Sequence, residues 1–196
     1  QWNIEAHYHS TGKEIFDDTD GGKYDVFVGG TGTGGTTSGV GRYLKQHAPR
    51  VKIIGADPLG SVHYHLFHTK TLPTAHVYMV EGIGEDIECR AMDFSVVDDM
   101  RQVNDRDSFV MARRLVREEG LFCGGSSGSN VAVAIEIAKE LGPGKVVLTV
   151  LPDHGNRYVS KFLSDAWMKE HGFTETEKEL GFVEELLKTL KTKPIT

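Results

Sequence analysis

Cysteine is scarce in this chain: only Cys89 and Cys123 occur among 196 residues, far apart and without a CxxC spacing. This scarcity excludes a disulfide scaffold and a cysteine-based zinc module. It predicts free thiols in a reducing compartment, and the cytoplasm is the expected location.

Long apolar runs and clusters of basic residues are missing as well. No stretch of about 18 apolar residues occurs, so no membrane-spanning helix is expected. A formal net charge of -6 without a concentrated block of Lys and Arg argues against nucleic-acid and anionic-membrane partners. The apolar share of 39% is enough for a substantial core, so a globular chain with a small-molecule ligand is expected.

An initiating Met and a signal-peptide pattern are absent from the amino terminus, which reads Gln1-Trp2-Asn3-Ile4. We therefore expect that the chain does not start where its gene starts.

Metal-binding patterns are also incomplete. Histidines fall in two groups, but neither cysteine nor carboxylate completes a ligand set locally, so no metal site is expected. The histidines concerned are His7, His9, His63, His65 and His68.

What is present is an alternation of short β-rich apolar runs with segments of helical periodicity. Strands are predicted at 24–28, 51–56, 76–80 and 145–151, with a short one at 121–123. Helices are predicted around 40–47, at 105–119 with Gly120 as the stop signal, and at 130–141 with Ser127 and Ser129 as caps. The alternation predicts an α/β fold, a doubly wound and mostly parallel sheet with helices on both faces, which binds ligands beyond the carboxyl ends of its strands.

Three glycine-rich loops follow predicted strands, at 29–39, 81–86 and 123–129. The first opens a helical segment, and its glycines and threonines supply backbone amides and hydroxyls to an anion beside the positive end of that helix. The sequence thus predicts a phosphate cradle within a pocket lined by backbone.

A dinucleotide site is the main alternative for the first loop. Residues 30–35 match GxGxxG, and Asp57 at the end of the next strand is placed to bind a ribose hydroxyl. Thr33 and Thr36 instead favour a terminal phosphate, which has more oxygens to satisfy than a bridging pyrophosphate. A P-loop is disfavoured because no Lys follows Gly34-Gly35.

The three loops, in this order and approximate spacing, resemble those of pyridoxal-phosphate enzymes of fold type II, the cysteine synthase and cystathionine β-synthase superfamily. Other segments are similar to its cystathionine β-synthase branch: Glu81, Arg113, residues 118–121, 161–165 and 167–168. The resemblance extends from His7 to about Phe173. It implies that residues 1–173 are the cofactor-anchoring part of a catalytic region, followed by a helical linker at 174–196 that leads toward a regulatory module.

The resemblance implies a pyridoxal 5′-phosphate cofactor. Its phosphate would lie against Gly32, Thr33, Gly34, Gly35 and Thr36, while Ser126 would meet the pyridine nitrogen and Gly82 would lie beside the cofactor. A neutral partner for that nitrogen favours elimination over transamination. Gly84 and Gln1 would contact the substrate.

The lysine that holds the cofactor as a Schiff base has no counterpart in this sequence, so no catalytic residue is assigned here. In the family it belongs to a smaller N-terminal domain. We therefore expect this chain to be the C-terminal part of a longer polypeptide.

The reaction that the resemblance implies is a β-replacement joining serine and homocysteine into cystathionine with loss of water, in a homodimer or larger homo-oligomer. A cysteine synthase, which uses O-acetylserine and sulfide, is the nearest alternative. A nicotinamide-dependent oxidoreductase and an inactive ligand-binding homologue are remoter ones.

Overall fold

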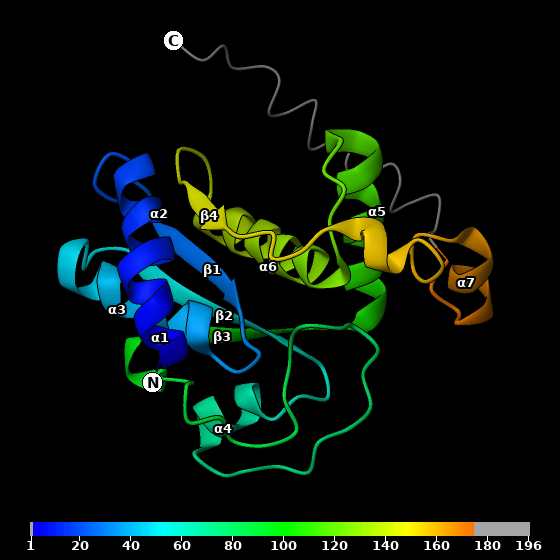
Figure 1. Ribbon diagram of the computed structural model, residues 1–196, viewed down its shortest axis with the longest axis horizontal. Helices are drawn as coiled ribbons and strands as arrows, with labels where there is room; N and C mark the ends of the chain where they lie inside the picture. Colours follow the sequence, from blue (N-terminus) through cyan, green and yellow to red (C-terminus); the bar gives the residue numbers. More distant parts are fainter. Residues whose placement is uncertain (1, 175–196) are drawn as a thin grey trace.

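A computed structural model describes residues 2–174 and shows a four-stranded sheet in the order β3-β2-β1-β4 (Figure 1). All neighbouring strands pair in parallel, and Val28 of β1 lies opposite Ile54 of β2 and Thr149 of β4. The strands are β1 (Val26–Gly30), β2 (Lys52–Pro58), β3 (Asp99–Val103) and β4 (Val147–Thr149). The predicted α/β fold with a parallel sheet is confirmed.

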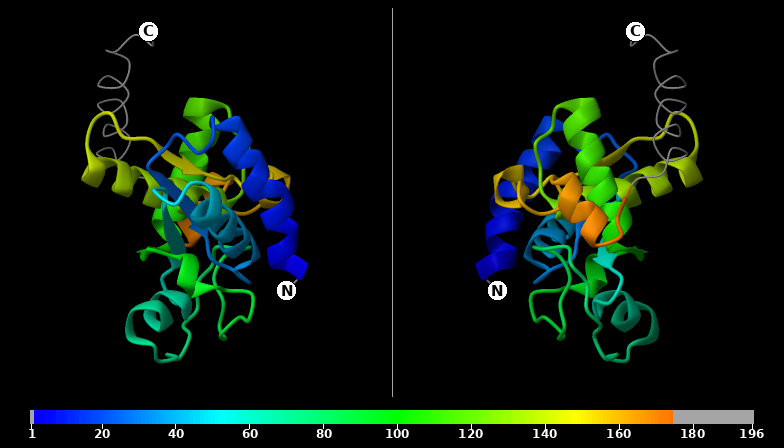
Figure 2. Two further views of the ribbon diagram at one scale, coloured as in Figure 1. Left: turned by 90° about the vertical axis from the view of Figure 1, so that its left-hand side faces the viewer. Right: turned by 90° about the vertical axis from the view of Figure 1, so that its right-hand side faces the viewer.

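Helices cover both faces of this sheet, as the side views show (Figure 2). One face carries α3, over which α1 packs, and the other carries α6, against which α5 packs. The helices are α1 (Trp2–His7), α2 (Lys13–Asp18), α3 (Gly35–His47), α4 (His63–Thr69), α5 (Asp105–Glu119), α6 (Gly125–Leu141) and α7 (Asp165–Glu170). A π-helical turn at Tyr8–Gly12 joins α1 to α2, and 3-10 turns lie at Phe94–Val96 and Gly155–Tyr158.

The core has two layers because side chains alternate along each strand. Phe27 of β1 packs with Val40 and Leu44 of α3, whereas Val28 packs with Val133 of α6 on the opposite face. Each of these side chains is at most 1% exposed. A strand that is apolar on both faces is what a parallel sheet between two helix layers requires.

Helix α5 has the predicted limits. The Asn104 side chain accepts a hydrogen bond from the Asp107 amide at the start, and Gly120 ends the helix with φ of 70°. A left-handed glycine after the last turn is a common helix stop because it carries no Cβ.

Two predicted strands are wrong. Residues 76–80 form no strand, because the amides of Met79 and Val80 donate to the Asp105 carboxylate at 2.8 and 2.9 Å instead of to a neighbouring strand. At 121–123 only an isolated bridge joins Cys123 to His154.

The predicted start and caps of the helix at 130–141 are wrong too. Helix α6 begins at Gly125, and Gly124 is its N-cap. Ser127 and Ser129 are fully buried inside the helix, where the Ser129 hydroxyl donates to Ser108 Oγ at 2.8 Å. Ser129 thus joins α6 to α5, and neither serine caps the helix.

The sequence reasoning missed β3 and the helical run from Trp2 to Asp18. Strand β3 lies at the edge of the sheet and reads Asp-Met-Arg-Gln-Val. Its polar residues interrupt the apolar pattern from which strands are predicted.

Near the end of the described chain, the left-handed Gly172 (φ 73°) follows α7. Residues 175–196 of the predicted helical linker lie outside the described residues, as does Gln1. Within residues 2–174, no helix is long and apolar enough to cross a membrane.

Candidate functional site

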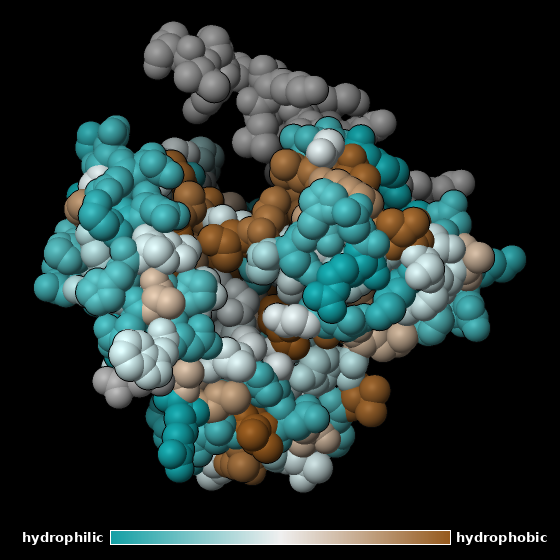
Figure 3. All heavy atoms as spheres, in the orientation of Figure 1, coloured by the Kyte–Doolittle hydropathy of each residue, from teal (hydrophilic) through white to brown (hydrophobic). Residues whose placement is uncertain are grey.

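A cavity of about 300 Å³ opens at the carboxyl ends of β1 and β4. The strand order reverses there, since β2 lies on one side of β1 and β4 on the other, and such switch points bind ligands in open α/β sheets. The space-filling view shows this face hollowed between α1 and the segment after β4 (Figure 3). The cavity is lined by Asn3, His7, Thr11, Gly30, Gly32, Thr33, Gly34, Gly35, Thr36, Gly82, Ile83, Ser126, Asn130, Val150 and Pro152.

The first glycine-rich loop forms one wall. It runs directly from β1 into α3, whose first-turn amides have no acceptor within the helix and lie at the cavity. Gly34 has φ of 92°, and a Cβ there would come within 2.5 Å of Met92 Cα, so only glycine fits. The Thr37 hydroxyl donates to Gly30 O at 2.9 Å and fixes the turn. The predicted cradle residues therefore lie together.

The second loop lies against the first. The Gly84 amide donates to Thr31 O at 2.8 Å, and a Cβ on Gly32 would be 3.7 Å from Gly82 O. Gly82 in turn faces Ser126, because a Cβ there would stand 4.0 Å from its Oγ. Gly32, Gly82 and Ser126 thus meet at one cavity. Gly84 does not line it, and a Cβ on Gly84 would strike Pro58 Cγ at 2.4 Å.

Ser126 and Asn130 supply the polar groups of α6, and their spacing places them on one face of the helix. Ser126 is 3% exposed, and Asn130 is fully buried. The Asn130 side-chain nitrogen donates to Val150 O at 3.0 Å, while its Oδ1 has no hydrogen-bond partner among the described residues. An orphaned buried oxygen in a cavity wall fits a site that a polar ligand completes.

Helix α1 and the π-helical turn after it contribute three lining residues that the sequence reasoning missed as a group: Asn3 and His7 of α1, and Thr11 of the turn. Asn3 and His7 both contact threonines of the first loop. Their i, i+4 spacing was the signal available, but the sequence does not reveal that this helix packs on α3.

The electrostatics of the cavity suit an anion held by neutral donors. No Lys, Arg, Asp or Glu occurs among the described residues that line it, and His7 is the one ionisable side chain there. Burial lowers the pKa of His7, which keeps its ring neutral near pH 7. Backbone amides, hydroxyls and a helix terminus remain as the groups that can bind a phosphate.

Asp57, the expected ribose ligand of a dinucleotide site, is unsuited to that role. It is fully buried below the first loop, where it accepts hydrogen bonds from the Thr31 hydroxyl and the Tyr64 amide, both at 2.9 Å. Burial raises the pKa of this carboxyl to about 6. Both of its carboxylate oxygens therefore already accept hydrogen bonds from within the protein.

The branch-marking residues form one cluster beside the third loop. Arg113 of α5 donates to Phe162 O at 2.9 Å and pairs with Asp165, and Lys161 pairs with Glu81 of the second loop. Segments far apart in sequence therefore meet where α5, α7 and the second loop converge.

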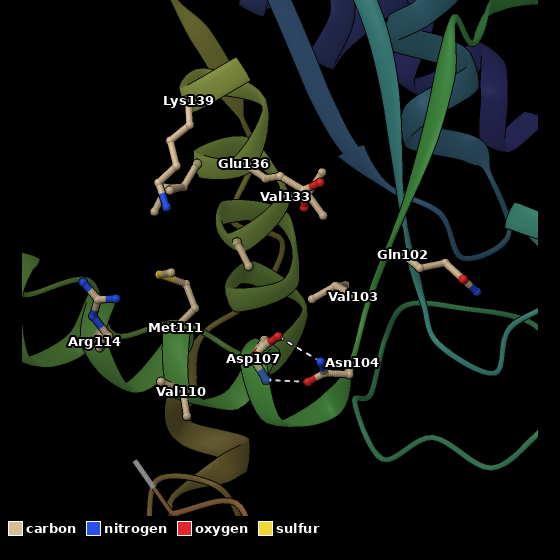
Figure 4. A pocket seen from close by; sticks show the side chains of 12 residues that line it. Gln102, Val103, Asn104, Asp107, Val110, Met111, Arg114, Val133, Glu136 and Lys139 are labelled. Carbon is tan, nitrogen blue, oxygen red and sulfur yellow. Dashed lines mark hydrogen bonds between the residues drawn. The ribbon is translucent and has the colours of Figure 1, made fainter. Parts of the chain in front are cut away.

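A larger groove of about 530 Å³ lies between β3, α5 and α6 (Figure 4). Its walls are mainly apolar, and at its base the Asn104 amide and the Asp107 carboxylate are hydrogen-bonded to each other at 2.8 Å. None of the predicted site residues lines it. The smaller cavity at the switch point is therefore the candidate site.

Comparison with known proteins identifies the family of the chain. The family described as "Pyridoxal-phosphate dependent enzyme" matches residues 1–153. The chain is 48% identical over 174 residues to the cystathionine beta-synthase of Mus musculus, covering 88% of this chain and 30% of that protein. It is 35% identical over 200 residues to the cystathionine beta-synthase of Saccharomyces cerevisiae, covering 97% and 39%, respectively.

A cysteine synthase of Dictyostelium discoideum is 35% identical over 192 residues, covering 92% of this chain and 50% of that protein. The chain thus spans between about a third and a half of the length of these relatives. With a matched family over most of its residues and a donor-lined cavity at the switch point, the chain belongs to the pyridoxal-phosphate-dependent enzymes.

Proposed function

We propose that this chain is the cofactor-anchoring part of an enzyme that joins serine and homocysteine into cystathionine with loss of water. The observation that carries the proposal is the single cavity where the phosphate-cradle loop, Gly82 and Ser126 meet. Similarity to cystathionine beta-synthases over 88% of the chain supports the choice of reaction.

In this proposal the first loop holds the cofactor by its phosphate. The amides of Gly32 to Thr36, the hydroxyls of Thr33 and Thr36 and the amino end of α3 donate to the phosphate oxygens. Gly32 keeps the cavity open because its missing Cβ would project beside Gly82 O. This end of the cavity anchors and orients the cofactor.

Ser126 holds the opposite, ring-nitrogen end. Bound pyridoxal phosphate supplies the electron sink that acidifies the α-proton of an amino acid and lets a β-substituent leave. A neutral hydroxyl does not stabilise a protonated ring nitrogen as a carboxylate would, which weakens the sink and favours β-elimination over transamination. Gly82 lets backbone approach the reacting carbons, and Gly84 and Gln1 are the proposed substrate contacts.

The overall change breaks the C–O bond of serine at its β-carbon and forms a C–S bond with homocysteine, and water leaves. The lysine that abstracts the α-proton is assigned to sequence outside this chain. A homodimer or larger homo-oligomer, a cytoplasmic location and the division into residues 1–173 and 174–196 belong to the same proposal.

The test uses the complete gene product loaded with pyridoxal phosphate. Supplied with serine and homocysteine, it is expected to form cystathionine, measured by mass spectrometry. Product only from O-acetylserine and sulfide would reject this reaction in favour of the cysteine synthase reaction. No turnover with either pair, despite bound cofactor, would reject both.

Cysteine synthase is the second candidate, and the 35% identity to the Dictyostelium discoideum enzyme supports it. Two ion pairs support the first candidate, because their residues mark the cystathionine β-synthase resemblance: Arg113 pairs with Asp165, and Lys161 pairs with Glu81.

A further inference from the structure

One face of α1 contacts the phosphate-cradle loop through hydroxyl groups. Asn3 Nδ2 donates to Thr33 Oγ1 at 3.0 Å, and His7 Nε2 lies 3.1 Å from Thr36 Oγ1. Asn3 and His7 share a helix face at i, i+4 spacing, and both line the cavity. The two threonines are those proposed to hold the cofactor phosphate.

Two glycines of the first run leave the space that α1 needs to contact α3. A Cβ on Gly35 would lie 2.2 Å from the Asn3 side chain, and one on Gly39 would lie 2.6 Å from His7 Cβ. Substitution at either position would push α1 away from α3. The glycine run therefore makes room for α1 as well as for a ligand.

The direction of the Thr33 hydroxyl hydrogen follows from the donor inventory, and that of the Thr36 hydrogen follows from the tautomer assigned to His7. A side-chain amide nitrogen only donates, so Thr33 Oγ1 accepts from Asn3 and its own hydrogen stays free. The second ring nitrogen of His7, Nδ1, lies 2.9 Å from Thr11 Oγ1. With the ring hydrogen on Nε2, His7 donates to Thr36 and accepts from Thr11, which leaves the Thr36 hydrogen free as well.

These directions matter because the cavity wall offers no cationic side chain among its described residues other than a protonated His7. A phosphate dianion there depends on neutral donors, and a hydroxyl whose hydrogen points elsewhere presents a repelling lone pair. Hydrogen bonds to a charged acceptor are about twice as strong as neutral ones. Setting two hydrogens in advance therefore favours the anion.

We propose that Asn3 and His7 are positioning residues that turn the hydroxyl hydrogens of Thr33 and Thr36 toward a bound phosphate monoester. The inference rests on the proposed function, since it assigns the phosphate end of the same site. It predicts that α1 acts on phosphate affinity through these hydroxyls and not through packing.

The experiment compares pyridoxal 5′-phosphate with pyridoxal, which lacks the phosphate, by fluorescence titration of the complete gene product. His7→Leu is expected to weaken pyridoxal phosphate binding about tenfold and to leave pyridoxal binding unchanged. His7→Gln, which keeps a donor, should recover most of the loss. Inorganic phosphate should compete with pyridoxal phosphate less effectively in the His7→Leu variant.

A double-mutant cycle identifies the route of the effect. If His7 acts through Thr36, His7→Leu combined with Thr36→Val binds pyridoxal phosphate no more weakly than Thr36→Val alone. Additive losses, or equal losses for pyridoxal, would mean that His7 only supports packing and would overturn the inference.

A second pair keeps the inference testable if His7→Leu does not fold. Asn3 contacts the loop but is still exposed to solvent, so Asn3→Ala should fold, and it should couple to Thr33→Val in the same way. Asn3→Asp should bind pyridoxal phosphate more weakly than Asn3→Ala, because a carboxylate takes the Thr33 hydrogen and repels the phosphate. Equal binding by these two variants would contradict the proposal.

His9→Leu is the matched control. The His9 side chain is 72% exposed, and its Nε2 lies 3.5 Å from Glu5 Oε2, away from the loop. This variant should bind both ligands as the wild type does. A wild-type protein that binds neither pyridoxal phosphate nor inorganic phosphate would refute the proposed function itself, whereas normal binding in every variant would refute only the role of α1.

Discussion

Helices α3 and α6 both begin in glycine-rich runs at the cavity, yet their glycines face different partners. At α3, a Cβ on Gly35 would meet the polar side chain of Asn3 at 2.2 Å. At α6, a Cβ on Gly128 would meet the backbone oxygen of Ser108 at 1.9 Å, and one on Gly125 would meet the Phe109 ring at 3.1 Å. The α3 run gathers hydrogen-bond donors around a cavity, whereas the α6 run lets α5 and α6 touch.

The difference teaches that a glycine-rich run at a helix start has two separate physical uses. In the α3 run, Gly32 keeps space open for a ligand, while Gly35 and Gly39 let α1 bring its hydrogen-bond donors close to that space. In the α6 run, glycine gives helix packing, and only Ser126 and Asn130 face the cavity. Substitutions in the two runs should therefore affect different quantities.

The largest expected effect is on folding, in the α6 run. Gly128→Ala should lower the free energy of unfolding by about 3 kcal/mol, because the new methyl overlaps a backbone oxygen that cannot move without separating α5 from α6. Chemical denaturation measures the change. A stable Gly128→Ala variant would contradict the packing role assigned to this run.

Gly32→Ala should give the opposite result. The nearest atom to its Cβ is 3.7 Å away, an ordinary contact, so stability should change by less than about 0.5 kcal/mol. Pyridoxal phosphate affinity should fall about 100-fold because the methyl group enters the cavity, a loss of about 2.7 kcal/mol. Retained affinity in this variant would show that the phosphate binds elsewhere.

The pH dependence of stability should distinguish the α3 run from the α6 run. Asp57 supports the α3 run by accepting a hydrogen bond from Thr31. Its pKa is raised to about 6 by burial, so the folded state keeps a proton that the unfolded state has lost. Stability from this group is therefore fully present below pH 3.8 and declines as pH rises to about 6, by on the order of 3 kcal/mol.

Asp57→Asn should remove that decline, which denaturant unfolding at several pH values between 4 and 7 would detect. The variant also separates the effect of Asp57 from that of buried His63. Burial lowers the pKa of His63, so this side chain destabilises the folded state as pH falls below 6.5, which is the opposite pH dependence. Identical pH profiles for variant and wild type would show that Asp57 is ionised in the folded protein.

Ser126→Ala should have the smallest effect, confined to the cavity. Pyridoxal phosphate affinity should fall modestly, and elimination from serine should slow by about tenfold, as expected for loss of one hydrogen bond to the cofactor. Stopped-flow absorbance of the complete gene product measures the rate. Unchanged turnover would refute the ring-nitrogen role.

Local patterns sufficed for β1, β2 and β4 and for the clustering of glycine loops. Residues 26–28 and 53–56 are continuous apolar segments, and their spacing from helices predicts parallel pairing. Helix α5 carries its own cap and stop, Asn104 and Gly120, so its limits were readable.

The sequence predictions are wrong where tertiary contacts, and not local sequence patterns, determine the structure. Residues 76–80 have strand-like composition, but Asp105 takes two of their amides. Ser127 and Ser129 resemble caps, but both are buried within α6, where Ser129 donates to Ser108 of α5. The contribution of Asn3 and His7 could not be predicted, because it depends on α1 packing over Gly35 and Gly39, which no local pattern encodes.

The central claim is that the glycine-lined cavity at the switch point holds the phosphate of pyridoxal phosphate. Parallel titrations of the complete gene product with pyridoxal phosphate and with NADH, for the wild type and Gly32→Ala, test it most directly. The account predicts tight binding of pyridoxal phosphate by the wild type, much weaker binding by Gly32→Ala, and no binding of NADH. Binding of NADH without affinity for pyridoxal phosphate would contradict it.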